Sequence, residues 1–168
     1  HMHKDTLEIR ELLPTVEVII EIVDARIPYS SENPDIQKFR GEKPCIKLLN
    51  KSDLADPEIT RQWLLHLEEH QGTKAMSINR QETDRIKGIL DLCRKLASKP
   101  ADDPNPVKAL ITGIPNVGKS TLINILAGRT IAKTGNEPAI TKAQQNILLD
   151  NGILLVDSPG ILWPKVEN

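Results

Sequence analysis

Short apolar runs alternate with amphipathic stretches along the chain. The run at residues 16–23 is rich in β-branched side chains and predicts a strand. Further strands are expected at residues 45–49, 74–78, 107–112, 146–149 and 153–156, the last two joined by an Asn-Gly turn. Segments with helical periodicity separate most of these runs, so the sequence predicts an α/β fold with a mostly parallel sheet covered on both faces.

The helices are expected between these strands. Asp56 before Pro57 is typical of a helix start, and that helix should run to about His70, before Gly72. Residues 83–97 place apolar side chains three and four positions apart, which predicts a helix with one face in the core. Two further helices are expected, at residues 119–127 and, as a short segment, at residues 35–40.

Composition narrows the class of protein. The 168 residues suit one domain, and 22 Lys and Arg against 23 Asp and Glu give a net charge of −1, so no bulk electrostatic attraction to DNA is expected. No apolar stretch approaches ~18 residues and residues 1–5 hold no apolar segment, so we expect neither a membrane span nor a secretory signal. The two cysteines, Cys45 and Cys93, are expected in the core, and a cytoplasmic location is the default.

A proline-rich linker is expected at residues 99–106, where three prolines exclude both helix and strand. It separates residues 1–98 from residues 107–168. Each half alternates strands and helices and carries its own motifs, described next.

Residues 113–120 match the phosphate-loop pattern G-x-x-x-x-G-K-[ST] between an expected strand and an expected helix. Glycines let main-chain N–H groups point at phosphate oxygens, and the helix N-terminus adds a favourable dipole. Lys119 would contact the outer phosphates and Ser120 would offer its hydroxyl to Mg²⁺. The candidate nucleotide-binding residues here are Asn116, Val117, Gly118, Lys119, Ser120 and Thr121.

A second motif ends the last expected strand with the string Asp157-Ser158-Pro159-Gly160. A carboxylate at Asp157 can hold Mg²⁺ through water. The main-chain N–H of Gly160 can bond a terminal phosphate and so report its loss.

A third motif, Asn50-Lys51-Ser52-Asp53, follows the expected strand at 45–49 and predicts selective binding of guanine over adenine nucleotides. A carboxylate at Asp53 can accept hydrogen bonds from guanine N1–H and the exocyclic amine, and adenine would leave it unpaired, a discrimination of roughly 10⁴-fold. Asn50 can bridge toward guanine N7 and neighbouring loops, while the Lys51 stem can cover the base. Main-chain N–H groups at Ser77 and Ile78 are a further candidate contact to guanine O6, with a plain strand end as the alternative.

The order of these motifs is unusual, because the base motif precedes the phosphate loop, whereas in most small GTPases it follows. The sequence therefore predicts a circular permutation, which is physically cheap since domain termini tend to lie close together. This order, together with the strings at residues 24–28, 113–120 and 157–165, resembles the YlqF/RbgA family of circularly permuted GTPases. No mechanism is evident for Asp24 and Arg26 in the first string; an ion pair that shapes the loop is the preferred interpretation.

The resemblance implies a three-layer P-loop NTPase fold that binds GTP and GDP with Mg²⁺ and hydrolyses GTP. It also implies a monomer that acts in assembly of the large ribosomal subunit, with that subunit or its precursor as partner. The family's helical C-terminal domain is expected to be absent from this chain. Thr141 matches the switch threonine of the family, so the resemblance makes it a candidate Mg²⁺ ligand. The candidate catalytic residues are Lys119, Thr141 and Gly160.

The catalytic machinery departs from the common pattern at one position. Ile161 stands where many GTPases place a glutamine that orients the attacking water, so slow hydrolysis stimulated by the ribosomal partner is expected. The resemblance makes Asn116 a candidate K⁺ ligand; a loop-stabilising asparagine is the alternative. His1 is the one position that matches a proposed helper histidine of the family.

Other interpretations remain at this stage. Residues 66–70 fit a His-x-x-Glu-His metalloprotease string, but two histidines on the edge of an amphipathic helix is preferred. A GTP/GDP-binding switch module without hydrolysis stays open. So does an ATP-using P-loop enzyme, which requires the string at residues 50–53 to be accidental.

Overall fold

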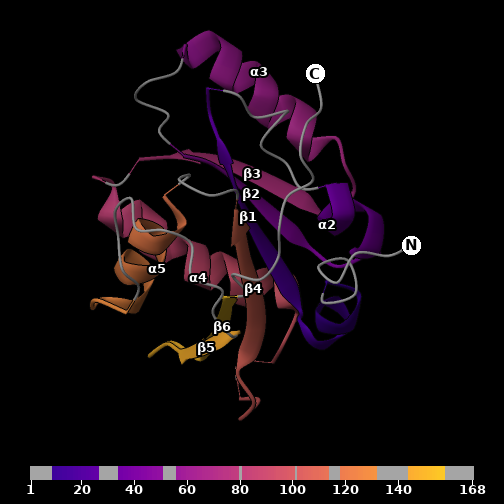
Figure 1. The fold of residues 1–168 in the computed structure, drawn as a ribbon, viewed down its shortest axis with the longest axis vertical. Coiled ribbons are helices and arrows are strands. Elements are labelled where there is room, and N and C mark those ends of the chain that lie inside the picture. Colours follow the sequence, from indigo (N-terminus) through magenta and orange to yellow (C-terminus); the bar gives the residue numbers. More distant parts are fainter. Residues whose placement is uncertain are drawn as a thin grey trace.

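The computed structural model describes residues 9–26, 34–50, 56–79, 81–100, 102–113, 118–131 and 144–157. At its centre is a six-stranded sheet in the order β3-β2-β1-β4-β6-β5 (Figure 1). The strands are β1 (Val18–Asp24), β2 (Cys45–Asn50), β3 (Thr73–Ile78), β4 (Val107–Gly113), β5 (Gln145–Leu148) and β6 (Ile153–Asp157). All neighbours pair in parallel except β5, which pairs antiparallel with β6 at one edge. The expected mostly parallel sheet is confirmed.

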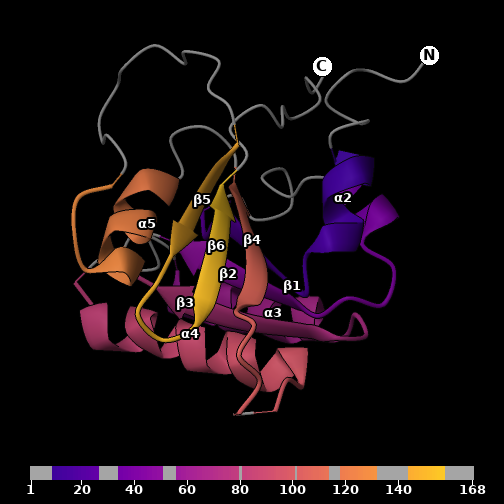
Figure 2. The same ribbon diagram turned by 90° about the horizontal axis from the view of Figure 1, so that it is seen from below.

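Helices lie on both faces of this sheet, and Figure 2 shows α5 and α2 on opposite sides of the strands. The helices are α2 (Pro34–Phe39), α3 (Pro57–Glu68), α4 (Thr83–Ala97) and α5 (Lys119–Ala127). The side chain of Asp56 caps α3 as expected, accepting hydrogen bonds from the main-chain N–H groups of Glu58 and Ile59 at 2.8 and 3.3 Å.

Alternation along the parallel strands divides the core between the two faces. On one face, residues such as Ile20, Leu48 and Ile111 pack with α4 and α5. On the other face, Ile19 and Cys45 pack with α2, and Val23 and Leu49 pack with α3, as two separate apolar clusters. Both cysteines are buried in the core as expected, and burial raises the pKa of Cys93 to about 12, so its thiol stays protonated at neutral pH.

The N-terminal segment was not predicted. Residues 9–12 are helical and a 3-10 turn, η1 (Leu13–Thr15), leads into β1. Ile9 and Leu13 are buried against the α2 side of the sheet. The segment is too short for its periodicity to stand out in the sequence.

The linker between the two halves is fixed at the amino ends of the strands. The ammonium of Lys99 contacts Glu17 Oε1 at 3.1 Å and donates to the carbonyl of Pro106 at 2.9 Å. The other carboxylate oxygen of Glu17 accepts the main-chain N–H of Lys108 at 2.8 Å. These bonds hold the end of α4, the linker and the start of β4 against β1.

A buried ion pair lies between the two apolar clusters on the α2 and α3 face. Glu21 on β1 and Lys47 on β2 are paired in register, and Lys47 Nζ donates to Glu21 Oε1. Their side chains are 0% and 2% exposed. Each charge is removed from water, so each depends on its partner for compensation.

Glu21→Ala is expected to destabilise the fold by about 3–5 kcal/mol, because it leaves the Lys47 ammonium buried without its carboxylate. Replacing both residues together, Glu21→Leu with Lys47→Met, should cost far less, because no charge remains buried. Urea unfolding followed by circular dichroism measures both. A double variant as unstable as Glu21→Ala would contradict the expectation.

Candidate functional site

The predicted motifs follow the carboxyl ends of the parallel strands, which all lie at the same end of the sheet. Asn50 ends β2, Ile78 ends β3, Gly113 ends β4 and Asp157 ends β6. α5 begins at Lys119 directly after the phosphate loop, and its first turn carries Ser120 and Thr121. In open α/β sheets, ligands bind at this edge, where neighbouring connections leave in opposite directions. Here that point lies between β1, which leads to β2, and β4, which leads toward β6.

The last glycine of the phosphate loop packs against the first residue of the base motif. Gly118 has φ +92° and caps the N-terminus of α5. A Cβ atom at this position would lie 2.5 Å from Nδ2 and 3.7 Å from Cγ of Asn50. The backbone conformation therefore favours glycine, and any side chain here would displace the amide end of Asn50. Two motifs that lie far apart in the sequence thus meet in one site.

The main chain of Asn50 is held from both sides. It pairs in register with Asp24 on β1 and with Ile78 on β3, and its carbonyl accepts the N–H of Ala25 at 2.9 Å. Ile78 is 1% exposed and anchors the end of β3. The Ser77–Ile78 strand end therefore lies beside Asn50, the first residue of the base motif, and its contact to guanine O6 stays a prediction.

Lys119 and Asp157 form an ion pair across the site. The Nζ–Oδ1 distance is 2.6 Å, and the side chains are 20% and 12% exposed. A cation and a carboxylate therefore lie together between the start of α5 and the end of β6. The hydroxyl of Ser120 and the carboxylate of Asp157 are hard oxygen donors of the kind Mg²⁺ prefers, so this donor set fits the expected ion.

Several predicted residues lie outside the described part of the chain. Their placement is not tested, and their roles stay predictions. They are Lys51 and Asp53 of the base motif, Asn116 and Val117 of the phosphate loop, Thr141, Gly160 and Ile161 of the switch segments, and His1.

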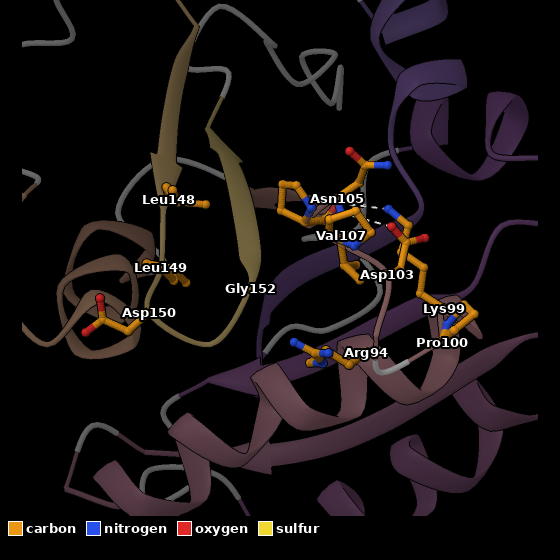
Figure 3. A pocket seen from close by; sticks show the side chains of 12 residues that line it. Arg94, Lys99, Pro100, Asp103, Asn105, Val107, Leu148, Leu149, Asp150 and Gly152 are labelled. Atoms are coloured by element: carbon orange, nitrogen blue, oxygen red, sulfur yellow. Dashed lines mark hydrogen bonds between the residues drawn. The ribbon is translucent and has the colours of Figure 1, made fainter.

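A hollow of about 340 Å³ lies at the amino end of the strands, opposite the candidate site. Figure 3 shows Leu148 and Leu149 on one side of it and linker residues such as Asp103 and Asn105 on the other. Its two cations are engaged by the protein: Arg94 donates to the carbonyl of Asn151 at 2.7 Å, and Lys99 is tied to Glu17 and Pro106. It contains none of the predicted motif residues.

The metalloprotease string lies at the end of α3. His66 contacts Trp63 edge-on, with ring centroids 5.6 Å apart, and its side chain is 55% exposed. Within the described ranges, no group of three or more His, Cys, Asp or Glu residues could hold a metal ion. Nor is any helix in them long and apolar enough to cross a membrane.

Known proteins with similar sequences are GTPases, as the motifs at this site predict. The family model described as "50S ribosome-binding GTPase" matches residues 108–168. Ribosome biogenesis GTPase A of Bacillus cereus is 46% identical over all of this chain, and that of Thermotoga maritima is 34% identical over 99% of it. The mouse mitochondrial ribosome-associated GTPase 1 is 34% identical over the full chain.

A solved structure supports the sequence matches. The GDP-bound structure of TM YlqF superposes with a TM-score of 0.63 at 31% identity, covering 94% of this chain and 59% of that one. The chain belongs to the YlqF/RbgA family of circularly permuted GTPases. YjeQ from Thermotoga maritima shares the fold, with a TM-score of 0.55 at 19% identity.

Membership of the family accounts for the order of the motifs and for the P-loop fold. The chain spans about three fifths of the length of the curated family members it matches, 59% of the protein from Bacillus cereus and 58% of that from Thermotoga maritima. The contact between Gly118 and Asn50 was missed from the sequence, although both residues were candidates. The signal available was the position of Asn50 directly after the expected strand at residues 45–49.

Gly118→Ala is expected to weaken nucleotide binding, because the positive φ disfavours any side chain and the added methyl would displace the amide end of Asn50. Adding Asn50→Ala to it should relieve the collision but not the backbone strain, and should not restore binding. Titration with fluorescent GDP measures both variants. Gly128→Ala is the matched control, because Gly128 also has positive φ, +70°, but nothing lies within 4 Å of the added atom. Equal binding by Gly118→Ala and Gly128→Ala would show that the close approach to Asn50 is unimportant.

Proposed function

We propose that this chain binds guanine nucleotide at the carboxyl edge of its sheet and hydrolyses GTP to GDP and phosphate during assembly of the large ribosomal subunit. The observation that carries the proposal is the packing of Asn50 against Gly118. It brings a motif that selects a base and a motif that holds phosphates within the span of one nucleotide.

The phosphate half of the site has the required charge. Lys119 places an ammonium at the start of α5, where the helix dipole also favours an anion. Its present partner is the carboxylate of Asp157, and a bound phosphate would compete for the same ammonium. Ser120, Asp157 and Thr141 are the proposed ligands of Mg²⁺, the first by its hydroxyl and Asp157 through water. When bound, Mg²⁺ offsets the negative charge of the phosphate oxygens.

The base half of the site rests on the motif that starts at Asn50. We assign Asp53 to guanine N1–H and the exocyclic amine, and Lys51 to the face of the base. Ser77 and Ile78 would offer main-chain N–H groups to guanine O6. In the phosphate loop, Asn116 and Val117 complete the set, with Asn116 also the proposed K⁺ ligand.

Hydrolysis by the isolated chain is proposed to be slow. Ile161 has no group that can orient water, so we propose that stimulation comes from a partner or from a group outside this motif, such as a K⁺ ion at Asn116. Gly160 is assigned to the terminal phosphate. The relatives named for ribosome biogenesis support a ribosomal partner, and we propose the large subunit or its precursor, met by a cytoplasmic monomer.

A switch module that binds GTP and GDP without hydrolysing GTP is the second candidate. The observation in its favour is the apolar residue at Ile161. Both candidates share the same nucleotide site and differ in the fate of the terminal phosphate.

Calorimetric titration with GDP, GTP and ATP is expected to show binding of the two guanine nucleotides and none of ATP at the same concentration. Asp53→Asn should weaken GDP binding by roughly 10- to 100-fold, because a hydrogen-bonded charge is lost, and should favour xanthosine diphosphate instead. ATP binding as tight as GDP binding would reject the guanine assignment in favour of an ATP-using enzyme.

Phosphate release from GTP is expected to be slow for the chain alone and faster with purified large ribosomal subunits. It should also be faster in K⁺ than in Na⁺ at equal ionic strength, because the smaller ion fits the proposed site less well. A colorimetric phosphate assay measures each rate. GTP binding without release under any of these conditions would favour the switch module, and equal rates in K⁺ and Na⁺ would remove the K⁺ site.

A further inference from the structure

We propose that Asp24 and Arg26 form a clamp that positions Asn50, the first residue of the base motif, against Gly118, the last glycine of the phosphate loop. The clamp is a specificity device: it acts on the choice of base and not on the grip on phosphate. This inference rests on the proposed guanine-nucleotide function.

The clamp is a compact three-bond contact at the end of β1. Oδ1 of Asp24 accepts the main-chain N–H of Arg26 at 2.9 Å and its Nε at 3.1 Å, and Oδ2 accepts Nη2 at 2.8 Å. Among the described residues, each side-chain hydrogen bond of Arg26 goes to Asp24. The hydrogen bonds and then the charge of Asp24 raise the pKa of Arg26 above its usual value, so the guanidinium stays charged. A planar guanidinium fork held at two points fixes the direction of the chain that leaves β1.

The clamp encloses the residue that holds Asn50. Ala25 lies between Asp24 and Arg26, and its N–H donates to the carbonyl of Asn50 at 2.9 Å. Asp24 is also the register partner of Asn50 in the sheet. This bond lies just beyond the last strand pair, where pairing would otherwise fray. By fixing the peptides on both sides of Ala25, the clamp fixes the donor that anchors Asn50.

The clamp also lies on the side of the sheet that carries the site. Ile20 and Ile22 point to the face covered by α4 and α5, and alternation puts Asp24 on that same face. α5 starts with Lys119 on this face. Asp24 is 7% exposed while the Arg26 side chain is 46% exposed, so a half-exposed guanidinium lies at the carboxyl end of β1, the strand between β2 and β4.

This arrangement explains why a carboxylate is nearly buried at the end of β1. An exposed surface ion pair would contribute little to folding stability, since such pairs are worth ~0–1 kcal/mol. Here the pair is joined by one main-chain bond to Asn50, and Asn50 in turn contacts Gly118. Displacing Asn50 would shift the residues that follow it, including the proposed guanine ligand Asp53.

The test compares GDP with inosine diphosphate, which has the same phosphates but lacks the exocyclic amine of guanine. In the full 168-residue chain, Arg26→Ala should weaken GDP binding about five- to tenfold, the worth of one well-placed hydrogen bond. The affinity for inosine diphosphate should fall by less, so the ratio of the dissociation constant of inosine diphosphate to that of GDP should fall toward one. Asp24→Asn keeps an oxygen for Nε but cannot accept from Nη2, and should lower the ratio by a smaller amount.

Two matched variants separate this role from others. Lys119→Ala should weaken both nucleotides alike and leave the ratio unchanged. Arg61→Ala breaks a similar ion pair, with Glu58 on the exposed surface of α3, and should leave both affinities unchanged. Melting temperatures measured alongside report any loss of folding.

The outcomes are distinct. A reduced ratio in Arg26→Ala with intact melting behaviour supports the clamp. Equal losses for both nucleotides, an unchanged ratio, or a collapse of the melting transition in Arg26→Ala would overturn it. Failure of the unmodified chain to bind GDP at all would instead reject the proposed function.

Discussion

The close approach of Asn50 to Gly118 is the contact on which the site depends. The two residues come from β2 and from the loop after β4, and β1 lies between those strands. Their meeting therefore requires β1 to hold both neighbours in the correct register at once. A slip of one residue on either side would reverse the facing of every side chain in that strand. The burial of both faces makes such a slip costly, and so protects the geometry of the site.

β1 is accordingly the most constrained strand of the sheet. All seven of its residues are buried, including the two carboxylates Glu21 and Asp24. Glu21 pairs with Lys47 inside the sheet, and Asp24 pairs with Arg26 at its end. Polar side chains in so apolar a strand are tolerated only with well-placed partners, and they specify which neighbours belong on each side.

Much of this could be predicted from the sequence, because the signals are local. α4 and α5 were predicted at their observed bounds, since their periodicity is complete and glycine or a linker follows. The strands were predicted to within about two residues, the usual uncertainty at element ends. Lys119 and Asp157 were assigned to one site from motif spacing, and they form an ion pair.

What could not be predicted depends on tertiary contacts. The pairing of Glu21 with Lys47 requires the strand order and register, neither of which is a local property. Two acidic residues on one predicted strand gave no indication of a buried lysine on the next strand. The same holds for Asp24 and Arg26, whose ion pair was expected but whose connection to Asn50 appears only when β1 and β2 are paired. The N-terminal residues Ile9 and Leu13 likewise show their place only in the folded sheet.

The anchorage of the linker by Lys99, Glu17 and Lys108 has a consequence for chain connectivity. It lies at the amino ends of the strands, while the nucleotide motifs lie at the carboxyl ends. Cleavage of the peptide backbone within residues 102–105 would therefore yield two fragments of three strands each, the first with the base motif and the second with the phosphate loop. Association of the fragments through β1 and β4 would rebuild the sheet, so a ligand that contacts both fragments at the carboxyl ends of the strands would favour their reassembly in trans.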